Sequence, residues 1–437
     1  MIHQDKKHSL ASLLRIIYTL GFLLVVPLFF ARLLWKSRIL PAYRKRWLER
    51  LGLNLPPVPH HGLWLHAVSV GEAVAAVPII KWLQTHYPDL AITVTSTTVT
   101  GSERVVKALG TSVFHCYLPY DIPWSLQRFI HKIQPRLAIM METELWPNLF
   151  FTCQKNKLPI LIANARLSPH SMRGYQKAQA LFLATLDCTA MVAAQSELDA
   201  DRFLKLGLPA EKLCVTGNMK FDVPTPPDAE EKGQILRQSF GQRSVLIAAS
   251  THEGEESLIL QAYKEIKEKC SDALLVLVPR HPERFKAVFE LVKAQGWSCV
   301  KRSTQEPCLT DTAVYLADTM GELPLLYAAS DVAFVGGSLV SIGGHNMLEA
   351  AVLGIPVLTG PYLHNFNYIS QALSAAAGMM VIESPSALAQ AVQQWFNDAA
   401  ARQAVGARAK AVVLRNQGAV ERLGRWIDRL LKTATSD

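Results

Sequence analysis

Short apolar runs separated by longer amphipathic stretches recur along most of the chain, which predicts alternating β-strands and α-helices. In the first half, strands are expected at residues 63–70, 90–98, 112–119, 137–141, 160–163 and 190–194. A second series is expected at 245–249, 274–278, 314–316, 332–335, 357–358 and 379–382. Helical patterns cover 72–86, begin again at Pro123 and fill 386–431. Such regular alternation requires right-handed crossovers, so the pattern predicts an α/β fold with two parallel, doubly wound sheets.

A proline-rich break separates the two series. Residues 221–232 read FDVPTPPDAEEK, and prolines in so short a run do not fit inside a helix or a sheet. We therefore expect a membrane anchor with its basic flank at 1–40, an N-terminal α/β domain at 41–222, a linker at 223–240, a C-terminal α/β domain at 241–405, and a C-terminal helix at 406–437 that returns to the N-terminal domain. Two such domains should face a cleft at the carboxyl ends of their strands, where ligands bind.

The N-terminal segment predicts a membrane anchor. Ile16 to Ala31 is uncharged and almost wholly apolar. It is shorter than the roughly 20 residues that a spanning helix needs, although Arg15 and Arg32 could snorkel and extend it. No signal-peptide cleavage pattern follows it. Pro27 suits a bent, shallow insertion as well as a span, and a buried core helix is the alternative. The heavier positive flank follows the segment, which places the body of the protein in the cytoplasm.

Composition narrows the class of protein. Half of the 437 residues are hydrophobic and 19% are charged, so the chain is folded rather than disordered. Its formal net charge of +9 fits an anionic partner: nucleic acid, a membrane surface or a phosphorylated substrate. The seven cysteines form no CxxC pair and no metal-ligand spacing, which favours reduced thiols in the cytosol.

A glycine-rich stretch, Val335 to Pro361, predicts a nucleotide site. A strand should run into a glycine turn, and Gly343-Gly344 should open a short helix whose N-terminal N–H groups accept a phosphate. Asn346 and Glu349 lie three apart, so we expect them on one helical face, holding the base and the sugar hydroxyls. The alternative is a plain glycine turn with a capping Asn and a solvated Glu.

Charged residues near other predicted strand ends supply candidate chemistry. Glu72 follows a strand at a helix start, where the dipole should keep it charged, and it could be a general base or a plain first-turn Glu. Glu142 and Glu144 follow another strand; either could lie on the surface, and we favour Glu142 because it is nearer the strand end. Pro147 is expected to end that segment. Lys220 could balance negative charge on a donor, or could be solvated.

Further candidates lie in the second half. Arg280 follows a strand directly and could clamp a phosphate, since guanidinium matches phosphate oxygens bidentately. His281 has no partner at metal-ligand spacing, so we expect a hydrogen-bond donor. Gly321 marks a turn before a helix, which would offer backbone N–H groups. P-loop and dinucleotide-binding patterns are absent from suitable contexts.

Taken together, HAVSVGE, METELWPN, GNMKFD, PRHPERF, DTMGEL and GGHNMLE occur in an order that resembles the 3-deoxy-D-manno-octulosonic acid (Kdo) transferases of Gram-negative bacteria. YLPYDIP (117–123), ANARLS (163–168) and THEGEE (251–256) also fit. The likeness runs from about residue 10 to 425, and no single motif carries it.

The resemblance implies a GT-B fold and an inverting transfer of Kdo from CMP-Kdo to a tetraacylated lipid A precursor in lipopolysaccharide biosynthesis. It implies Glu72 as the base, and Glu142 and Lys220 as groups that stabilise the transition state. The N-terminal domain would bind the acceptor and the C-terminal domain the donor. CMP would be held by Pro279, Arg280, Met320, Gly321, Glu322, Asn346, Met347, Leu348 and Glu349. The expected partners are CMP-Kdo, the phosphorylated precursor and inner-membrane lipids, with no nucleic acid, cofactor or metal.

The chain departs from the family pattern at a few positions. Met347 and Ala350 stand where the family often has prolines, Val99 stands in a segment that commonly reads TPTGSE, and His170 replaces an arginine. Two other classes remain open: a GT-B enzyme with a UDP-sugar, such as a 2-epimerase or a lipid A disaccharide synthase, and a non-enzymatic, membrane-tethered nucleotide-binding module.

Overall fold

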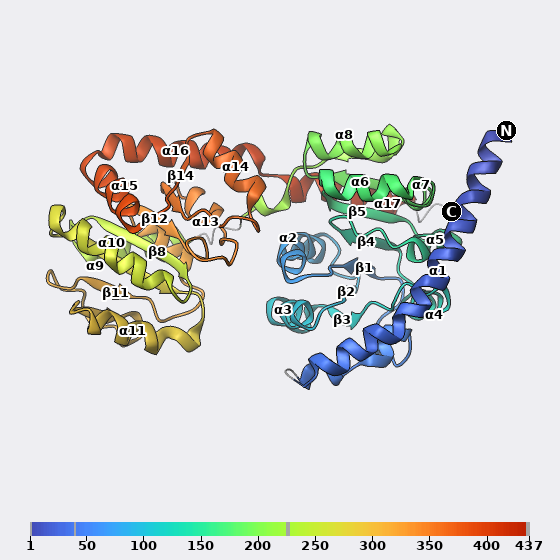
Figure 1. Cartoon of the computed structure of the whole chain (residues 1–437), viewed down its shortest axis with the longest axis horizontal. Helices are drawn as coiled ribbons and strands as arrows, with labels where there is room; N and C mark the ends of the chain where they lie inside the picture. Colours follow the sequence, from blue (N-terminus) through green and yellow to red (C-terminus); the bar gives the residue numbers. More distant parts are fainter. Residues whose placement is uncertain (1, 39–40, 224–227, 434–437) are drawn as a thin grey trace. The chain divides into compact units, whose positions relative to one another are not determined.

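The protein forms two compact units in a computed structural model that describes residues 2–38, 41–223 and 228–433. Unit 1 comprises Met1–Asp222 and Gln417–Asp437, and unit 2 comprises Val223–Asn416. Each unit is built around its own parallel sheet and is described by itself (Figure 1).

Unit 1 contains a seven-stranded sheet in the order β3-β2-β1-β4-β5-β6-β7, and neighbouring strands all pair in parallel. The strands are β1 (Leu63–His66), β2 (Ile92–Ser96), β3 (Phe114–Tyr117), β4 (Leu137–Met141), β5 (Ile160–Ala165), β6 (Met191–Ala194) and β7 (Leu213–Val215). The helices that accompany them are α2 (Val70–His86), α3 (Val99–Leu109), α4 (Pro123–Ile133), α5 (Pro147–Lys155), α6 (Pro169–Lys177), α7 (Gln179–Asp187), α8 (Glu197–Leu206) and α17 (Ala419–Thr433). All carboxyl ends of the strands therefore lie along one edge of the sheet.

Both faces of this sheet are buried, as is typical of parallel sheets. Leu63 and Leu65 belong to the core on the side of α2 and α17, whereas Trp64 belongs to the core on the other side with Phe129 of α4. Figure 1 shows α2 and α3 on one side of the sheet and α4 and α5 on the other. The predicted strand 63–70 ends at His66, because the Ser69 side chain caps α2.

The C-terminal helix packs on unit 1. Asp222 accepts hydrogen bonds from the backbone N–H groups of Gly418 and Val420, both at 2.6 Å, and so satisfies the amino end of α17. Gly424 lies so close to Trp82 that a Cβ there would come within 2.3 Å of the ring. The crossing occurs later than the expected boundary at 406, because residues before 417 continue α16 of unit 2.

Unit 2 contains a second seven-stranded parallel sheet, in the order β10-β11-β9-β8-β12-β13-β14. Its strands are β8 (Val245–Thr251), β9 (Leu274–Pro279), β10 (Cys299–Lys301), β11 (Val314–Leu316), β12 (Val332–Val335), β13 (Val357–Thr359) and β14 (Met379–Val381). Its helices are α9 (Ala229–Phe240), α10 (Glu255–Lys269), α11 (Phe285–Ala294), α12 (Leu323–Ala328), α13 (Leu348–Ala351), α14 (Asn367–Ala375), α15 (Pro385–Asn397) and α16 (Ala399–Asn416).

Several expectations need correction. Residues 229–240, assigned to the linker, form α9, whose Leu236 and Phe240 are buried in unit 2. Of the proline run 224–227, nothing is described. Pro147 begins α5 instead of ending its segment, because proline is well tolerated in the first turn of a helix. The edge strands β7 and β10 were not predicted; each is only three residues long.

Residues 2–36 form one long helix, α1 (Ile2–Lys36). Its segment Ser9–Lys36 is long and apolar enough to cross a membrane, with a mean hydropathy of 2.2. One face of α1 contacts unit 1: the ring of Phe22 lies 6.4 Å from that of Trp146, and Asn148 donates a 2.9 Å hydrogen bond to Thr19. In Figure 1 this helix runs alongside α5 and α7. The opposite face leaves many large apolar side chains exposed, among them Leu20, Leu24 and Leu28.

Candidate functional site

Glu72 lies in the first turn of α2, just beyond the carboxyl end of β1. Its Oε2 accepts a 2.8 Å hydrogen bond from the backbone N–H of Val68, and its Oε1 accepts one of 2.8 Å from the Ser69 hydroxyl. The Ser69 oxygen accepts in return from the Glu72 N–H at 3.3 Å, which completes a capping box. The residue is only 6% exposed, and this burial raises the pKa of the Glu72 carboxyl against the effect of its hydrogen bonds. The sequence predicted a carboxylate that the helix dipole keeps charged; in the structure, burial opposes that effect on the Glu72 pKa.

The structure brings Glu142 and Glu144 close to Glu72. Glu142 follows β4 with a φ of 56°, a left-handed conformation that is uncommon outside glycine, and its N–H donates to the Ala163 carbonyl at 2.9 Å. Burial, and next the charge of Glu72, raise the pKa of Glu144 to about 7. The charge of Glu142 contributes to the raised pKa of Glu72. The ionisation of Glu144 is therefore coupled to that of Glu72.

The coupling predicts how Glu144 affects stability. A carboxyl whose pKa is higher in the folded than in the unfolded protein stabilises the fold below the unfolded pKa, and that stabilisation is lost as the pH rises through the folded value. We expect Glu144→Gln, which stays neutral, to be more stable than the wild type by about 1–3 kcal/mol above pH 7, and the difference to vanish near pH 4. Urea unfolding at both pH values measures it. A difference of equal size at both values would contradict the raised pKa.

The loop that carries Lys220 is anchored to the same edge of the sheet. Asn218 accepts a 3.0 Å hydrogen bond from the Lys220 N–H, and the Oδ1 of the fully buried Asn164 accepts one of 3.1 Å from the Met219 N–H. Asn164 has a φ of 55° at an irregularity between β5 and β6, and its carbonyl accepts from the Gln195 side chain at 2.8 Å. Such irregularities are common beside active sites. Sequence reasoning missed this role, although ANARLS contributed to the resemblance.

In unit 2, Glu255 organises the glycine-rich loop. This fully buried carboxylate, in the first turn of α10, accepts four backbone hydrogen bonds of 2.7–2.9 Å. The donors are His252, Gly337, Ser338 and Leu339. Gly336 leaves no room for a Cβ, which would lie 2.7 Å from the Ser250 carbonyl and 2.9 Å from Glu255. Sequence reasoning missed Glu255 as well; the only signal was its place in THEGEE.

Arg280 lies beyond the carboxyl end of β9, near His252, His345 and Glu349. Its backbone N–H donates to the Thr251 carbonyl at 3.0 Å. Burial, and next the charge of Arg280, lower the pKa of His345 to about 4. Burial raises the pKa of Glu349, while the Asn346 hydrogen bond and the charge of Arg280 oppose that rise. The Nε2 atoms of His252 and His345 lie 2.7 Å apart, so one ring donates and the other accepts.

The segment around Asn346 differs from the predicted helix. Residues 343–347 are irregular and α13 begins only at Leu348, because Gly343 and Gly344 have φ angles of 110° and 79° that no helix contains. Asn346 therefore precedes the helix: its Oδ1 accepts from the Leu348 N–H at 3.2 Å, and its amide donates to Glu349 at 3.0 Å. Met347 and Leu348 are fully buried, so neither residue is open to a ligand in this structure.

The turn before α12 offers a mixed set of groups. Gly321 has a φ of 87°, and Met320 is 53% exposed. Glu322 binds Arg302 through both oxygens, at 2.9 and 3.2 Å, and this partner lowers the pKa of the carboxyl. The Glu322 carboxylate is therefore already paired with a cation. Pro279 ends β9 immediately before Arg280. Among the residues that the structure describes, no group of three His, Cys, Asp or Glu could hold a metal ion.

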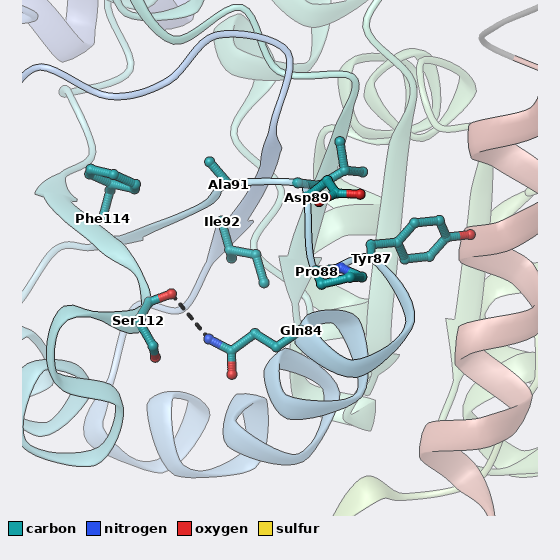
Figure 2. Close-up of a pocket in the computed structure, with 9 residues that line it drawn as sticks. Gln84, Tyr87, Pro88, Asp89, Ala91, Ile92, Ser112 and Phe114 are labelled. Carbon is teal, nitrogen blue, oxygen red and sulfur yellow. Dashed lines mark hydrogen bonds between the residues drawn. The ribbon is translucent and has the colours of Figure 1, made fainter.

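A hollow of about 440 Å³ in unit 1 lies away from these residues (Figure 2). It is lined at the amino ends of β2 and β3, by Ile92 and Phe114 among others. Two of its lining residues are linked, because the side chain of Gln84 donates a 3.1 Å hydrogen bond to the Ser112 carbonyl. Because Glu72 and Glu142 follow the carboxyl ends of their strands, this hollow is at the opposite edge of the sheet and is separate from the candidate site.

The two seven-stranded α/β units define a GT-B fold, and solved structures share it. UDP-GlcNAc 2-epimerase from Neisseria meningitidis aligns over 83% of this chain and all of its own, at 16% identity and a TM-score of 0.54. A glycosyltransferase from Rickettsia africae aligns over 87% of this chain and all of its own, at 13% identity and a TM-score of 0.53. These likenesses concern the fold alone.

Sequence comparison assigns the family. Residues 45–223 match the family model described as 3-deoxy-D-manno-octulosonic-acid transferase (kdotransferase). The 3-deoxy-D-manno-octulosonic acid transferase of Haemophilus influenzae is 43% identical over 413 residues, which cover 94% of this chain and 97% of that protein. The chain therefore belongs to the Kdo transferase family, and it is a glycosyltransferase.

Proposed function

We propose that this enzyme transfers Kdo from CMP-Kdo to a sugar hydroxyl of a phosphorylated, tetraacylated lipid A precursor, with inversion and with Glu72 as the general base. Membership of the Kdo transferase family supports the transferred sugar. The observation that carries the mechanism is the Glu72 carboxyl, held by Val68 and Ser69 at the carboxyl edge of the sheet with a raised pKa. A base is most effective when its pKa approaches the working pH.

In the proposed reaction the acceptor oxygen bonds to the anomeric carbon of Kdo while the bond from that carbon to the phosphate oxygen breaks. The bonding electron pair leaves with CMP, and the hydroxyl proton moves to Glu72. CMP departs as an anion that needs stabilising donors rather than a proton. Lys220 and Glu142 are proposed to stabilise the transition state, and the reaction as written requires no cofactor or metal.

We propose that unit 2 holds CMP around Arg280, with Asn346 and Glu349 toward the nucleoside. Arg280 would bind the phosphate, because a guanidinium forms charge-assisted hydrogen bonds with phosphate oxygens. The exposed turn of Met320 and Gly321 would complete the site, whereas Met347 and Leu348 are fully buried and would support it from below the surface.

The apolar helix α1 supports membrane attachment. We propose that it anchors the enzyme in the cell inner membrane, with both units on the cytoplasmic side. The exposed leucines of α1 suit acyl chains, and basic residues near its carboxyl end, such as Arg32 and Lys36, suit anionic headgroups.

Purified protein with CMP-Kdo and the tetraacylated precursor tests the proposal directly, with the product mass as the readout. A gain of one or more Kdo units is expected. Release of CMP without glycolipid product, or transfer from a UDP-sugar instead, would refute it. In a thermal-shift experiment CMP should stabilise the protein and UDP should do so much less.

Arg280→Ala should weaken CMP binding by about 1.5–3 kcal/mol, because it removes a charge-assisted phosphate contact. Cytidine lacks the phosphate, so its affinity should be the same for both proteins. Calorimetry with CMP and cytidine measures both. Equal losses for the two ligands would show that Arg280 does not contact the phosphate.

A further inference from the structure

Arg50 is a buried cation that pairs with no anion in the described part of the chain. It lies in the 3-10 helix η2 (Trp47–Leu51), between α1 and the start of the unit 1 sheet, and it is only 4% exposed. Among the residues that the structure describes, its side chain has no hydrogen-bond acceptor and no ion-pair partner. The guanidinium instead lies over the ring of Tyr117, 4.2 Å from its centre. A buried charge without a counter-ion is costly, so an anion from outside the chain is the expected partner.

The nearest carboxylate is already committed elsewhere. Glu49 forms a 2.7 Å ion pair with Arg46, and its second oxygen accepts from the Tyr117 N–H at 2.9 Å. Arg46 also donates to the His115 carbonyl at 2.8 Å, so its own nitrogens are engaged. Glu49 therefore neutralises Arg46 and does not serve as the counter-ion of Arg50.

The groups around Arg50 suit a phosphate. Tyr43, Tyr117 and Tyr120 are close enough for their hydroxyls to interact electrostatically with the guanidinium. The ammonium of Lys36 lies over the Tyr43 ring, 5.5 Å from its centre, and adds a second cation. Hydroxyl donors with a fork-shaped cation match the oxygens of a phosphate monoester.

The cluster around Arg50 lies between the carboxyl edge of the unit 1 sheet and α1. Tyr117 ends β3, so the cluster lies at the same edge of the sheet as Glu72, two strand spacings or about 10 Å along it. The N–H of Tyr120 donates to the Arg50 carbonyl, and the Tyr120 ring lies 5.5 Å from the rings of both Phe29 and Phe30 of α1. The cluster thus connects the catalytic edge to the helix that we assign to the membrane.

We propose that Arg50, with Lys36 and the three tyrosines, binds a phosphate group of the membrane-embedded glycolipid acceptor while its sugar hydroxyl meets Glu72. The inference rests on the proposed function and adds to it the site that recognises the acceptor's charge. An acceptor held at both points would be oriented along the carboxyl edge of unit 1.

Arg50→Met is the decisive variant, because methionine keeps the packing on Tyr117 and removes the charge. With saturating CMP-Kdo, its KM for the phosphorylated precursor should rise about 10–100-fold, the equivalent of one charge-assisted contact, while kcat stays near the wild-type value. On precursor dephosphorylated by a phosphatase, the difference from wild type should largely disappear. Arg44→Met is the matched control: Arg44 is exposed in the same basic segment, bound to Ser37, and its loss should leave both KM values near wild type.

The thermal stability of Arg50→Met distinguishes a phosphate-binding role of Arg50 from a purely structural one. Replacing an unpaired buried charge with an apolar side chain of similar size should keep or raise Tm. A lower Tm with an unchanged KM would make Arg50 a structural residue and overturn the proposal. An equal rise in KM for both acceptors would overturn it as well.

Flotation of the full-length protein with phosphatidylcholine vesicles distinguishes the two possible sources of the phosphate, the glycolipid precursor and an anionic lipid headgroup. Vesicles carrying the phosphorylated precursor should bind Arg50→Met less than wild type, whereas vesicles carrying phosphatidylglycerol should bind both alike. A matching loss on phosphatidylglycerol would assign the site to lipid headgroups and refute the acceptor. If wild-type protein transfers no Kdo, the proposed function fails, and this binding difference still decides the phosphate site.

Discussion

Glu72→Gln should lower kcat about 10²–10⁴-fold, because it removes the general base. The fold should survive. The Gln oxygen can accept from the Val68 N–H, and its amide can donate to the Ser69 hydroxyl, which accepts as readily as it donates. CMP affinity should stay near wild type, since the proposed CMP contacts belong to unit 2. Rates at saturating CMP-Kdo and precursor, with calorimetry for CMP, measure the effect.

The pH profile adds an independent readout for the base. Only the ionised Glu72 can accept a proton, and burial raises the pKa of its carboxyl. The wild-type kcat should therefore rise with pH across that raised pKa, and the residual activity of the Gln variant should lack this rise. An unaltered profile would transfer the role to Glu144 or Glu142.

A second capping box in unit 1 provides the matched control. In α8, Asp199 accepts from the Ser196 hydroxyl and its N–H donates back to Ser196, the same arrangement as that of Glu72 and Ser69. Asp199 also pairs with Arg202 at 3.2 Å, so Asp199→Asn should cost at least as much stability as Glu72→Gln and leave kcat near wild type. If the two variants lose activity only in proportion to unfolded protein, Glu72 is a helix cap and not the base.

The sequence predicted the two sheets well, because buried parallel strands read as uninterrupted apolar runs with turn residues between them. It missed β7 and β10, since a three-residue edge strand leaves too little pattern to distinguish it from a loop. It also placed a helix directly after Gly343-Gly344. Both glycines have positive φ angles, and a Cβ at Gly343 would clash with His364 and Asn365, a contact that local sequence does not contain.

The sequence predicts the position of a site residue along its element, but not the burial or the pKa of its side chain. Glu72 was predicted at a helix start from the strand that precedes it, and the capping box with Ser69 confirms that position. The direction of its pKa shift depends on burial and on Glu142, which is 70 positions away. The burial of Arg50 could not be predicted either, because a basic run such as 44–50 does not reveal which arginine is buried.

Glu255→Ala should destabilise unit 2 by about 3–5 kcal/mol, because breaking a buried charged contact leaves its partners without compensation. The orphaned groups are four backbone N–H donors, three of them in the loop 337–339. Each buried donor without an acceptor costs about 1–3 kcal/mol, partly relieved if the loop opens to water. Urea unfolding of the full-length protein measures the loss.

The same substitution should remove CMP binding at temperatures where the protein is still folded. Gly337 packs so closely on the His345 ring that a Cβ there would lie 2.9 Å from it. A displaced loop should therefore also displace the segment that leads to Asn346. Glu255→Gln should fall between wild type and Ala, since its single oxygen can accept only some of the four hydrogen bonds. Glu253→Ala, an exposed glutamate two residues earlier, should change stability by less than about 0.5 kcal/mol and leave CMP affinity intact. Normal CMP affinity in folded Glu255→Ala would show that CMP binding does not depend on the position of the loop 337–339.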